Sequence, residues 1–197
     1  HIATIVQAGE VLKLVLEDIS DLDRLENGKL RIDAKSADPR EIARGVVAAF
    51  RPAAQDKQLE LFLDVGPEVP ALMTLDPLRV RQVLFNLVAN AVRYTTHGGV
   101  RVGLHAHASP NEGCVRLAFV VADTGSGMSR AQLALVFGRE KLCAEGDGPG
   151  LGLSISMRLA RLMGGQLSAK SEMGEGSVFT FLLDAAPAAA ATPTKAA

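Results

Sequence analysis

Residues 76–94 read DPLRVRQVLFNLVANAVRY, and the apolar residues of this stretch recur at helical spacing, which predicts a helix from Pro77 to Tyr94. One face of this helix is polar, because the following side chains lie one above another: Arg79, Gln82, Asn86, Asn90 and Arg93. The opposite face is apolar and is expected to be buried: Val80, Val83, Leu84, Leu87, Val88 and Ala91. Asn is a mediocre helix former, so two Asn residues one turn apart beside a buried face favour a functional role over an ordinary solvated surface.

Further helices and strands are predicted on both sides of this helix. Asp38 is suited to be the N-cap of a helix that runs to near Ala54, with Pro39 at its first position and Glu41 reaching back to the cap. Shorter helical patterns span 129–137 and 151–163, and strand-like runs span 59–65, 72–75, 100–106, 115–122, 166–169 and 178–183. Strands and helices do not alternate strictly. We therefore predict an α+β fold, a two-layer α/β sandwich of one mixed sheet with helices on one face, over a doubly wound parallel sheet.

The two ends of the chain differ from this central part. Apolar residues recur at alternating three- and four-residue steps from Ile5 to Leu22, which predicts a bundle helix within residues 1–33. Residues 34–184 are expected to form the main domain. Residues 185–197 are rich in Ala, Pro and Thr and are interpreted as a linker or disordered tail.

Composition excludes several classes of function. The chain has 197 residues and a net charge of −1, so nucleic acid is not an expected partner. No apolar run approaches the roughly 20 residues of a membrane-spanning helix, and no membrane contact is expected. Cys114 and Cys143 are isolated, so we interpret them as reduced thiols of a cytoplasmic protein.

Three glycine-containing motifs follow the polar-striped helix. Residues 119–128 read FVVADTGSGM, an apolar strand that ends in Asp123, with glycines that let a ligand approach the backbone. Residues 148–153 read GPGLGL and open a helix whose free N–H groups suit a phosphate, but no strand precedes them, as a dinucleotide-binding fingerprint would require. Residues 174–181 read GEGSVFTF, a tight turn before an alternating strand. Taken singly, each motif indicates only a turn or a hairpin.

In their order and spacing, the four motifs resemble the N box and the three glycine boxes of the histidine-kinase ATPase domain, whose fold is shared with gyrase, a heat-shock chaperone and mismatch-repair ATPases. Residues 2–33 resemble the second helix of the kinase dimerisation and phosphotransfer hairpin. The resemblance implies a catalytic domain that binds ATP and Mg²⁺ and transfers the γ-phosphate to a histidine on a helix outside this sequence. It also implies a homodimer through the bundle helix and a response-regulator receiver domain as partner.

The resemblance also implies a role for each matching residue. Asn90 is expected to be the Mg²⁺ ligand, while Asn86 and Arg93 are the expected catalytic residues beside it and near the phosphates. Tyr94 would lie against the adenine, and Asp123 would accept a hydrogen bond from the adenine amino group, where guanine has a carbonyl instead. The remaining expected nucleotide-binding residues are Gly125, Gly127, Gly150, Leu151, Gly152, Leu153 and Ser177.

Departures from the family pattern leave alternatives open. The family lid opens with a Phe-x-Pro-Phe box, whereas residues 136–140 read VFGRE and keep only Phe137. No phosphoacceptor box is found. We interpret His97, His105 and His107 as exposed strand or loop residues, since His105 and His107 alternate along a strand with no carboxylate in register. The alternative is a pseudokinase scaffold that dimerises and docks a response regulator, as in some alphaproteobacterial cell-cycle proteins. A hydrolytic ATPase is disfavoured, because gyrase-like ATPases have at the Asn86 position a Glu that activates water.

Overall fold

The computed structural model of the protein describes residues 30–138 and 151–188. Nearly all of the predicted bundle helix lies outside the described residues, as do Gly150 and most of the predicted tail. The elements in chain order are β1 (Lys35–Ala37), α2 (Pro39–Asp56), β2 (Glu60–Val65), β3 (Met73–Leu75), α3 (Pro77–Tyr94), β4 (Gly99–Ala108), β5 (Val115–Asp123), α4 (Arg130–Gly138), α5 (Leu151–Leu162), β6 (Gln166–Glu172) and β7 (Gly176–Pro187). None of the helices in the described ranges is both long and apolar enough to cross a membrane.

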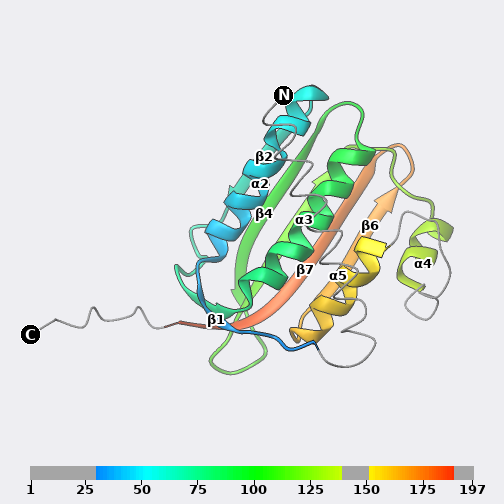
Figure 1. Ribbon diagram of the computed structural model, residues 1–197. Helices are drawn as coiled ribbons and strands as arrows, with labels where there is room; N and C mark the ends of the chain where they lie inside the picture. The colour runs from blue at the N-terminus through cyan, green and yellow to red at the C-terminus, as the bar shows by residue number, and fades with distance from the viewer. Residues whose placement is uncertain (1–29, 139–150, 189–197) are drawn as a thin grey trace, which may run out of the picture.

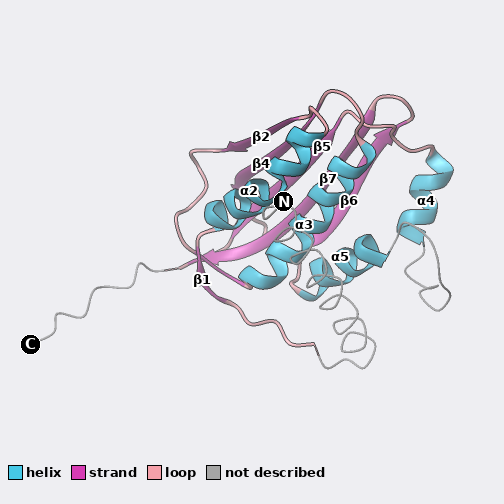
Figure 2. Cartoon of the chain, turned by 45° about the horizontal axis from the view of Figure 1, so that its top comes forward, coloured by secondary structure: helices cyan, strands magenta, loops and turns pink. Residues whose placement is uncertain are grey.

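The described strands form one seven-stranded mixed sheet. Its order is β1-β3-β7-β5-β4-β2, with β6 also paired to β7. β2 and β4 pair in parallel, and the other neighbouring strands pair antiparallel. Helices α2, α3 and α5 lie side by side on one face of this sheet, as Figures 1 and 2 show from two directions. The predicted two-layer α/β sandwich is therefore confirmed.

The hydrophobic core lies between the helices and the inner face of the sheet. Side chains alternate along each strand, so one set from β5 and β7 points inward. Phe119 of β5 and Phe181 of β7 are register partners, and their rings stack with centroids 5.6 Å apart. The predicted apolar face of α3 is fully buried in this core: Val80, Val83, Leu84, Leu87, Val88 and Ala91.

The domain extends further toward the C-terminus than the sequence predicted. The tail was expected to begin at Ala185, but β7 continues to Pro187 and Ala185 is buried. Strand β3 pairs with Ala186 and Pro187, and the Ala188 N–H donates to the Leu72 carbonyl. Because these backbone partners come from a segment more than a hundred residues earlier in the chain, the local Ala/Pro composition did not reveal the strand.

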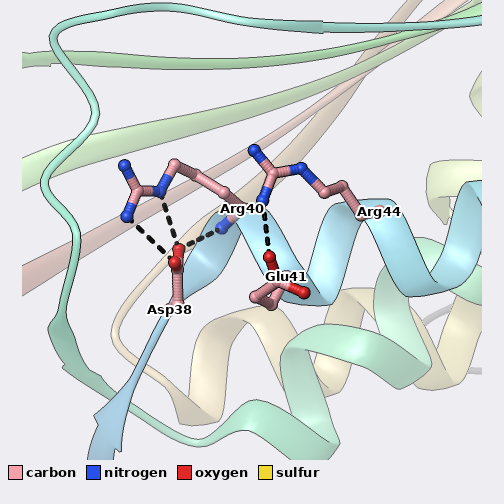
Figure 3. A network of polar contacts seen from close by, with 4 residues as sticks. All are labelled: Asp38, Arg40, Glu41 and Arg44. Atoms are coloured by element: carbon pink, nitrogen blue, oxygen red, sulfur yellow. Dashed lines mark hydrogen bonds and ion pairs between the residues drawn. The ribbon is translucent and has the colours of Figure 1, made fainter.

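Helix α2 begins as predicted, with one difference in its capping network (Figure 3). Asp38 is the N-cap and accepts a hydrogen bond from the Arg40 backbone N–H at 2.9 Å. The Arg40 guanidinium also donates to both carboxylate oxygens of Asp38. Glu41 was expected to reach back to the cap, but its carboxylate pairs instead with Arg44 one turn later. The Glu41 carboxylate therefore binds the Arg44 guanidinium in place of the backbone N–H of Asp38 that the capping box predicted.

The C-terminal end of α3 is held by a lysine from another helix. The Lys57 ammonium, at the C-cap of α2, donates to the carbonyls of Val92, Arg93 and Thr95 at 2.7, 2.9 and 3.3 Å. A helix C-terminus carries partial negative charge, so a cation placed there stabilises it.

Replacing Lys57 with Met is therefore expected to lower the free energy of unfolding by about 0.5–1 kcal/mol, because the α3 carbonyls lose their cation. Urea denaturation followed by circular dichroism measures this change. Lys35→Met is the matched control, since the one contact of the Lys35 ammonium within the described ranges is an exposed pair with Asp33 at 3.7 Å. Equal midpoints for the two variants would contradict the prediction.

Candidate functional site

The polar stripe of α3 divides into a buried part and an accessible part. Arg79 and Gln82 are only 9% and 2% exposed, and the Arg79 guanidinium donates to Gln82 Oε1 at 2.8 Å. Helix α5 packs against α3, and this first half of the stripe is removed from solvent in the folded domain. The site residues are therefore those in the second half, from Asn86 onward.

Asn86 contacts the helix that follows the GPGLGL motif. Its Nδ2 atom donates to the Gly152 carbonyl at 3.2 Å and to Ser156 Oγ at 3.3 Å. Ser156 Oγ in turn donates to the same carbonyl at 2.8 Å. A Cβ atom on Gly152 would lie 3.3 Å from Asn86 Oδ1, so the glycine lets the amide lie flat against α5. The fold thus brings together two residues from separate predicted motifs and adds Ser156, which the sequence analysis missed.

An amide, a cation and an aromatic ring occupy the last turn and a half of α3. Asn90 is half-buried, and within residues 30–138 and 151–188 its side chain has no hydrogen-bond partner. The Arg93 side chain is exposed, with its guanidinium carbon 5.4 Å from the centroid of the Tyr94 ring. The Tyr94 side chain is 41% exposed. All three groups are available to a ligand beside the C-terminal end of the helix.

Asp123 ends β5 next to this helix terminus. The Gly125 N–H donates to Asp123 Oδ1 at 2.8 Å, and the Ser177 backbone N–H also donates to the carboxylate. Burial raises the pKa of Asp123 above its usual value of 3.8, although these two hydrogen bonds act in the opposite direction. A Cβ atom on Gly125 would lie 2.6 Å from the Tyr94 carbonyl oxygen, so only glycine fits where the loop meets α3. We call Tyr94, Asp123, Gly125 and Ser177 the Asp123 cluster.

Two glycines with positive φ close the loops around this cluster. Gly127 has φ of 60° and Gly176 has φ of 107°. A Cβ atom on Gly127 would overlap the Glu172 carbonyl oxygen, and one on Gly176 would overlap the Asp123 carbonyl oxygen. The loop after β5 and the turn between β6 and β7 are therefore packed backbone against backbone, which other residues would prevent.

Ser171 joins these two loops and was not predicted from the sequence. Its Oγ accepts a hydrogen bond from the Met128 N–H at 2.8 Å and donates to the Gly176 carbonyl at 2.9 Å. The Ser177 hydroxyl oxygen lies 3.0 Å away. The predicted strand ended at Ala169, whereas β6 continues to Glu172. A serine at an inward-facing position of an otherwise apolar strand face was the available signal.

Known proteins similar to this chain identify its family. The profile of the family described as histidine kinase-, DNA gyrase B-, and HSP90-like ATPase matches residues 75–187, more than half of the chain. The chain belongs to this family.

Several members of the family resemble it closely. The sensory/regulatory protein RpfC of Xanthomonas campestris pv. campestris is 36% identical over 197 residues, which cover 98% of this chain and 27% of that protein. The autoinducer 2 sensor kinase/phosphatase LuxQ of Vibrio cholerae serotype O1 is 34% identical over 188 residues, 93% of this chain and 22% of that protein. The structure of full-length ShkA in complex with AMPPNP matches with a TM-score of 0.75 and 32% identity, over 92% of this chain and 37% of that one. The predicted resemblance to the ATPase domain of sensor histidine kinases is confirmed, while the chain spans only 22–27% of the length of the two sequence relatives.

The GPGLGL motif, which was expected to be the family's second glycine box, lies only partly within the described residues. Gly150 lies outside the described residues, and α5 begins at Leu151. Leu153 is 7% exposed and belongs to the hydrophobic core, so only its backbone can face a ligand. Phe137, which was expected to mark the start of the lid, packs against the core, and α4 ends at Gly138.

The surroundings of His105 differ from those that the sequence predicts. His105 was expected to have no carboxylate in register, but its Nδ1 is 3.5 Å from Glu68 Oε1 and its Nε2 is 3.8 Å from Asp64 Oδ2. The expectation was wrong because β2, which carries Asp64, pairs in parallel with β4, and Glu68 lies in the loop after β2. Neither placement is visible in the local sequence. Among the described residues, no group of three His, Cys, Asp or Glu side chains is placed to hold a metal ion.

Proposed function

We propose that this chain is the MgATP-binding catalytic domain of a two-component sensor histidine kinase. The observation that carries the proposal is the Asp123 cluster, in which a half-buried carboxylate with a raised pKa is held by two backbone N–H groups beside an exposed tyrosine ring. A carboxylate that is desolvated without a cationic partner is unfavourable for stability, and such groups concentrate at functional sites.

The Asp123 cluster suits an adenine base. An ionised carboxylate only accepts hydrogen bonds, so it matches the amino group of adenine and opposes the carbonyl that guanine has at the same position. The Tyr94 ring offers an apolar surface against which the base can pack. ATP should therefore be selected over GTP by the chemistry of this carboxylate.

The accessible residues of α3 suit the triphosphate and its metal. The Asn90 amide oxygen is a ligand type that Mg²⁺ accepts, and it has no partner among the described side chains. Mg²⁺ held at Asn90 would neutralise part of the phosphate charge, and the Arg93 guanidinium would be a second cation near the phosphates. The residues present therefore fit MgATP.

Asn86 favours protection of the γ-phosphate over its hydrolysis. A neutral amide cannot take a proton from water, and its nitrogen is committed to the Gly152 carbonyl. We propose that the γ-phosphate passes instead to a histidine on a helix outside this chain, since imidazole is a good nucleophile near neutral pH. The pseudokinase alternative is not favoured, because relatives such as LuxQ are named as kinases.

Partners follow from the same proposal. We propose that residues 1–33 form the second helix of the dimerisation hairpin, that the parent protein is a homodimer and that it phosphorylates a response-regulator receiver domain. The alignment with RpfC covers 98% of this chain and so extends over nearly all of these residues, which supports the assignment.

A nucleotide titration of the purified protein tests the proposal. ATP is expected to bind more tightly with Mg²⁺ than without it. It is also expected to bind at least about tenfold more tightly than GTP, because the guanine carbonyl repels the Asp123 carboxylate where the adenine amino group donates a hydrogen bond to it. Isothermal titration calorimetry with both nucleotides, with and without Mg²⁺, measures the constants. Equal affinities for ATP and GTP would contradict the assignment of Asp123 to the base.

A further inference from the structure

We propose that Ser171 is a positioning residue for the base end of the nucleotide site, because it fixes the direction of the Ser177 hydroxyl and so contributes to the preference for an amino group over a carbonyl. The inference rests on the proposed function, since it concerns the same site. In the sheet, Ser177 lies between Ser171 and Asp123, so Ser171 itself is not expected to touch the nucleotide.

The argument begins with the hydrogen bonds around Ser171 Oγ. Three groups lie within bonding distance of it: the Met128 N–H at 2.8 Å, the Gly176 carbonyl at 2.9 Å and the Ser177 hydroxyl at 3.0 Å. A serine hydroxyl has one proton to donate and two lone pairs with which to accept. The N–H can only donate and the carbonyl can only accept, so the single Ser171 proton goes to Gly176.

The direction of the third hydrogen bond then follows. Since the Ser171 proton is used, the Ser177 hydroxyl must donate its own proton to Ser171 Oγ. This arrangement satisfies all three contacts at once, and no buried side-chain N or O atom among the described residues lacks a hydrogen-bond partner. Ser177 is therefore left with lone pairs only and offers no proton to a ligand.

Ser177 stands directly beside the base-recognising carboxylate. It pairs with Asp123 across β5 and β7, is 7% exposed, and has its backbone N–H directed at the Asp123 carboxylate. Of the side chains that the structure describes on these two strand ends, Asp123 and Ser177 thus present two oxygen acceptors and no donor. Such a surface suits a ligand edge that donates N–H, and it opposes a carbonyl at the same place.

Ser171→Ala releases the Ser177 proton, which can then turn toward the site and meet a carbonyl. The test compares ATP with ITP, whose base has a carbonyl in place of the adenine amino group. Wild type is expected to prefer ATP, and Ser171→Ala should reduce the ratio of the two affinities by roughly two- to tenfold, the range for one neutral hydrogen bond. Ser171→Thr keeps the hydroxyl and should retain the wild-type ratio. Should the alanine variant not fold, Ser171→Cys replaces the hydroxyl with a weak donor at similar size and should lower the ratio in the same way.

Two further variants separate this role from simple support of the fold. Ser168→Ala is the matched control, because Ser168 is exposed on the same strand and should leave both affinities unchanged. In a Ser177→Ala background, adding Ser171→Ala should change the ratio no further, since the hydroxyl through which Ser171 acts is already gone. Equal weakening of ATP and ITP by Ser171→Ala, or a ratio that still falls in the Ser177→Ala background, would overturn the inference. A wild type that binds neither nucleotide would instead contradict the proposed function itself.

Discussion

The full-length protein carrying Asn90→Ala is expected to show no detectable phosphorylation at saturating ATP. The variant removes the side-chain oxygen that we propose as the Mg²⁺ ligand, and phosphoryl transfer depends on neutralising the charge of the γ-phosphate. The fold should tolerate the change, because the Asn90 side chain makes no hydrogen bond to another described residue and Ala is a better helix former than Asn. Incorporation of labelled γ-phosphate measures the loss.

Two other variants sharpen this result. Asn90→Asp retains a metal ligand but adds negative charge beside the triphosphate, so it should reduce the rate of transfer more than ATP affinity. Asn111→Ala is the control, because Asn111 lies in the loop after β4 and donates to Asp184, away from α3. Normal phosphorylation by the Asn90→Ala protein would show that the metal is held by other groups.

Asp123→Asn is expected to weaken ATP binding by about 1.5–3 kcal/mol, the value of a hydrogen bond to a charged acceptor. An amide at this position can also turn its NH₂ group toward the adenine amino group, which places two donors together. Isothermal titration calorimetry of the two proteins measures the difference. Asp64→Asn is a suitable control, because Asp64 is an exposed carboxylate on β2, which β4 separates from the strand of Asp123.

The same substitution should not lower the stability of the nucleotide-free protein. Burial raises the pKa of Asp123 above 3.8 in the folded state. The protonated carboxyl is therefore the form that favours folding, and its contribution is complete when the pH is below 3.8. This contribution is lost as pH rises through the folded pKa, so at pH 7 the ionised group opposes folding. Asp123→Asn should therefore melt at the same temperature as wild type or higher, while wild-type ATP affinity should fall as the carboxyl is protonated in acid. A large drop in melting temperature would identify Asp123 as a structural turn residue.

Local sequence determined much of this protein. The helix from Pro77 to Tyr94 has the predicted bounds, and its apolar face is buried as the spacing indicated. These features depend on helical periodicity and on turn residues such as Gly127, whose physical effects extend over only a few neighbouring positions. The order of the four motifs also led to the family, because each motif is short and continuous along the chain.

Tertiary structure decided which atoms of those residues face a ligand. The Asn86 amide is oriented by Gly152 and Ser156, which lie 66 and 70 residues away, and the Ser177 hydroxyl is oriented by Ser171 on the neighbouring strand. The burial of Arg79 and Gln82 and the extension of β7 along β3 likewise depend on packing against other segments. A side-chain pattern predicts which groups lie on one face of a helix or strand. The direction of a hydrogen bond depends on its partner, and here most of the partners come from distant segments that only folding brings together.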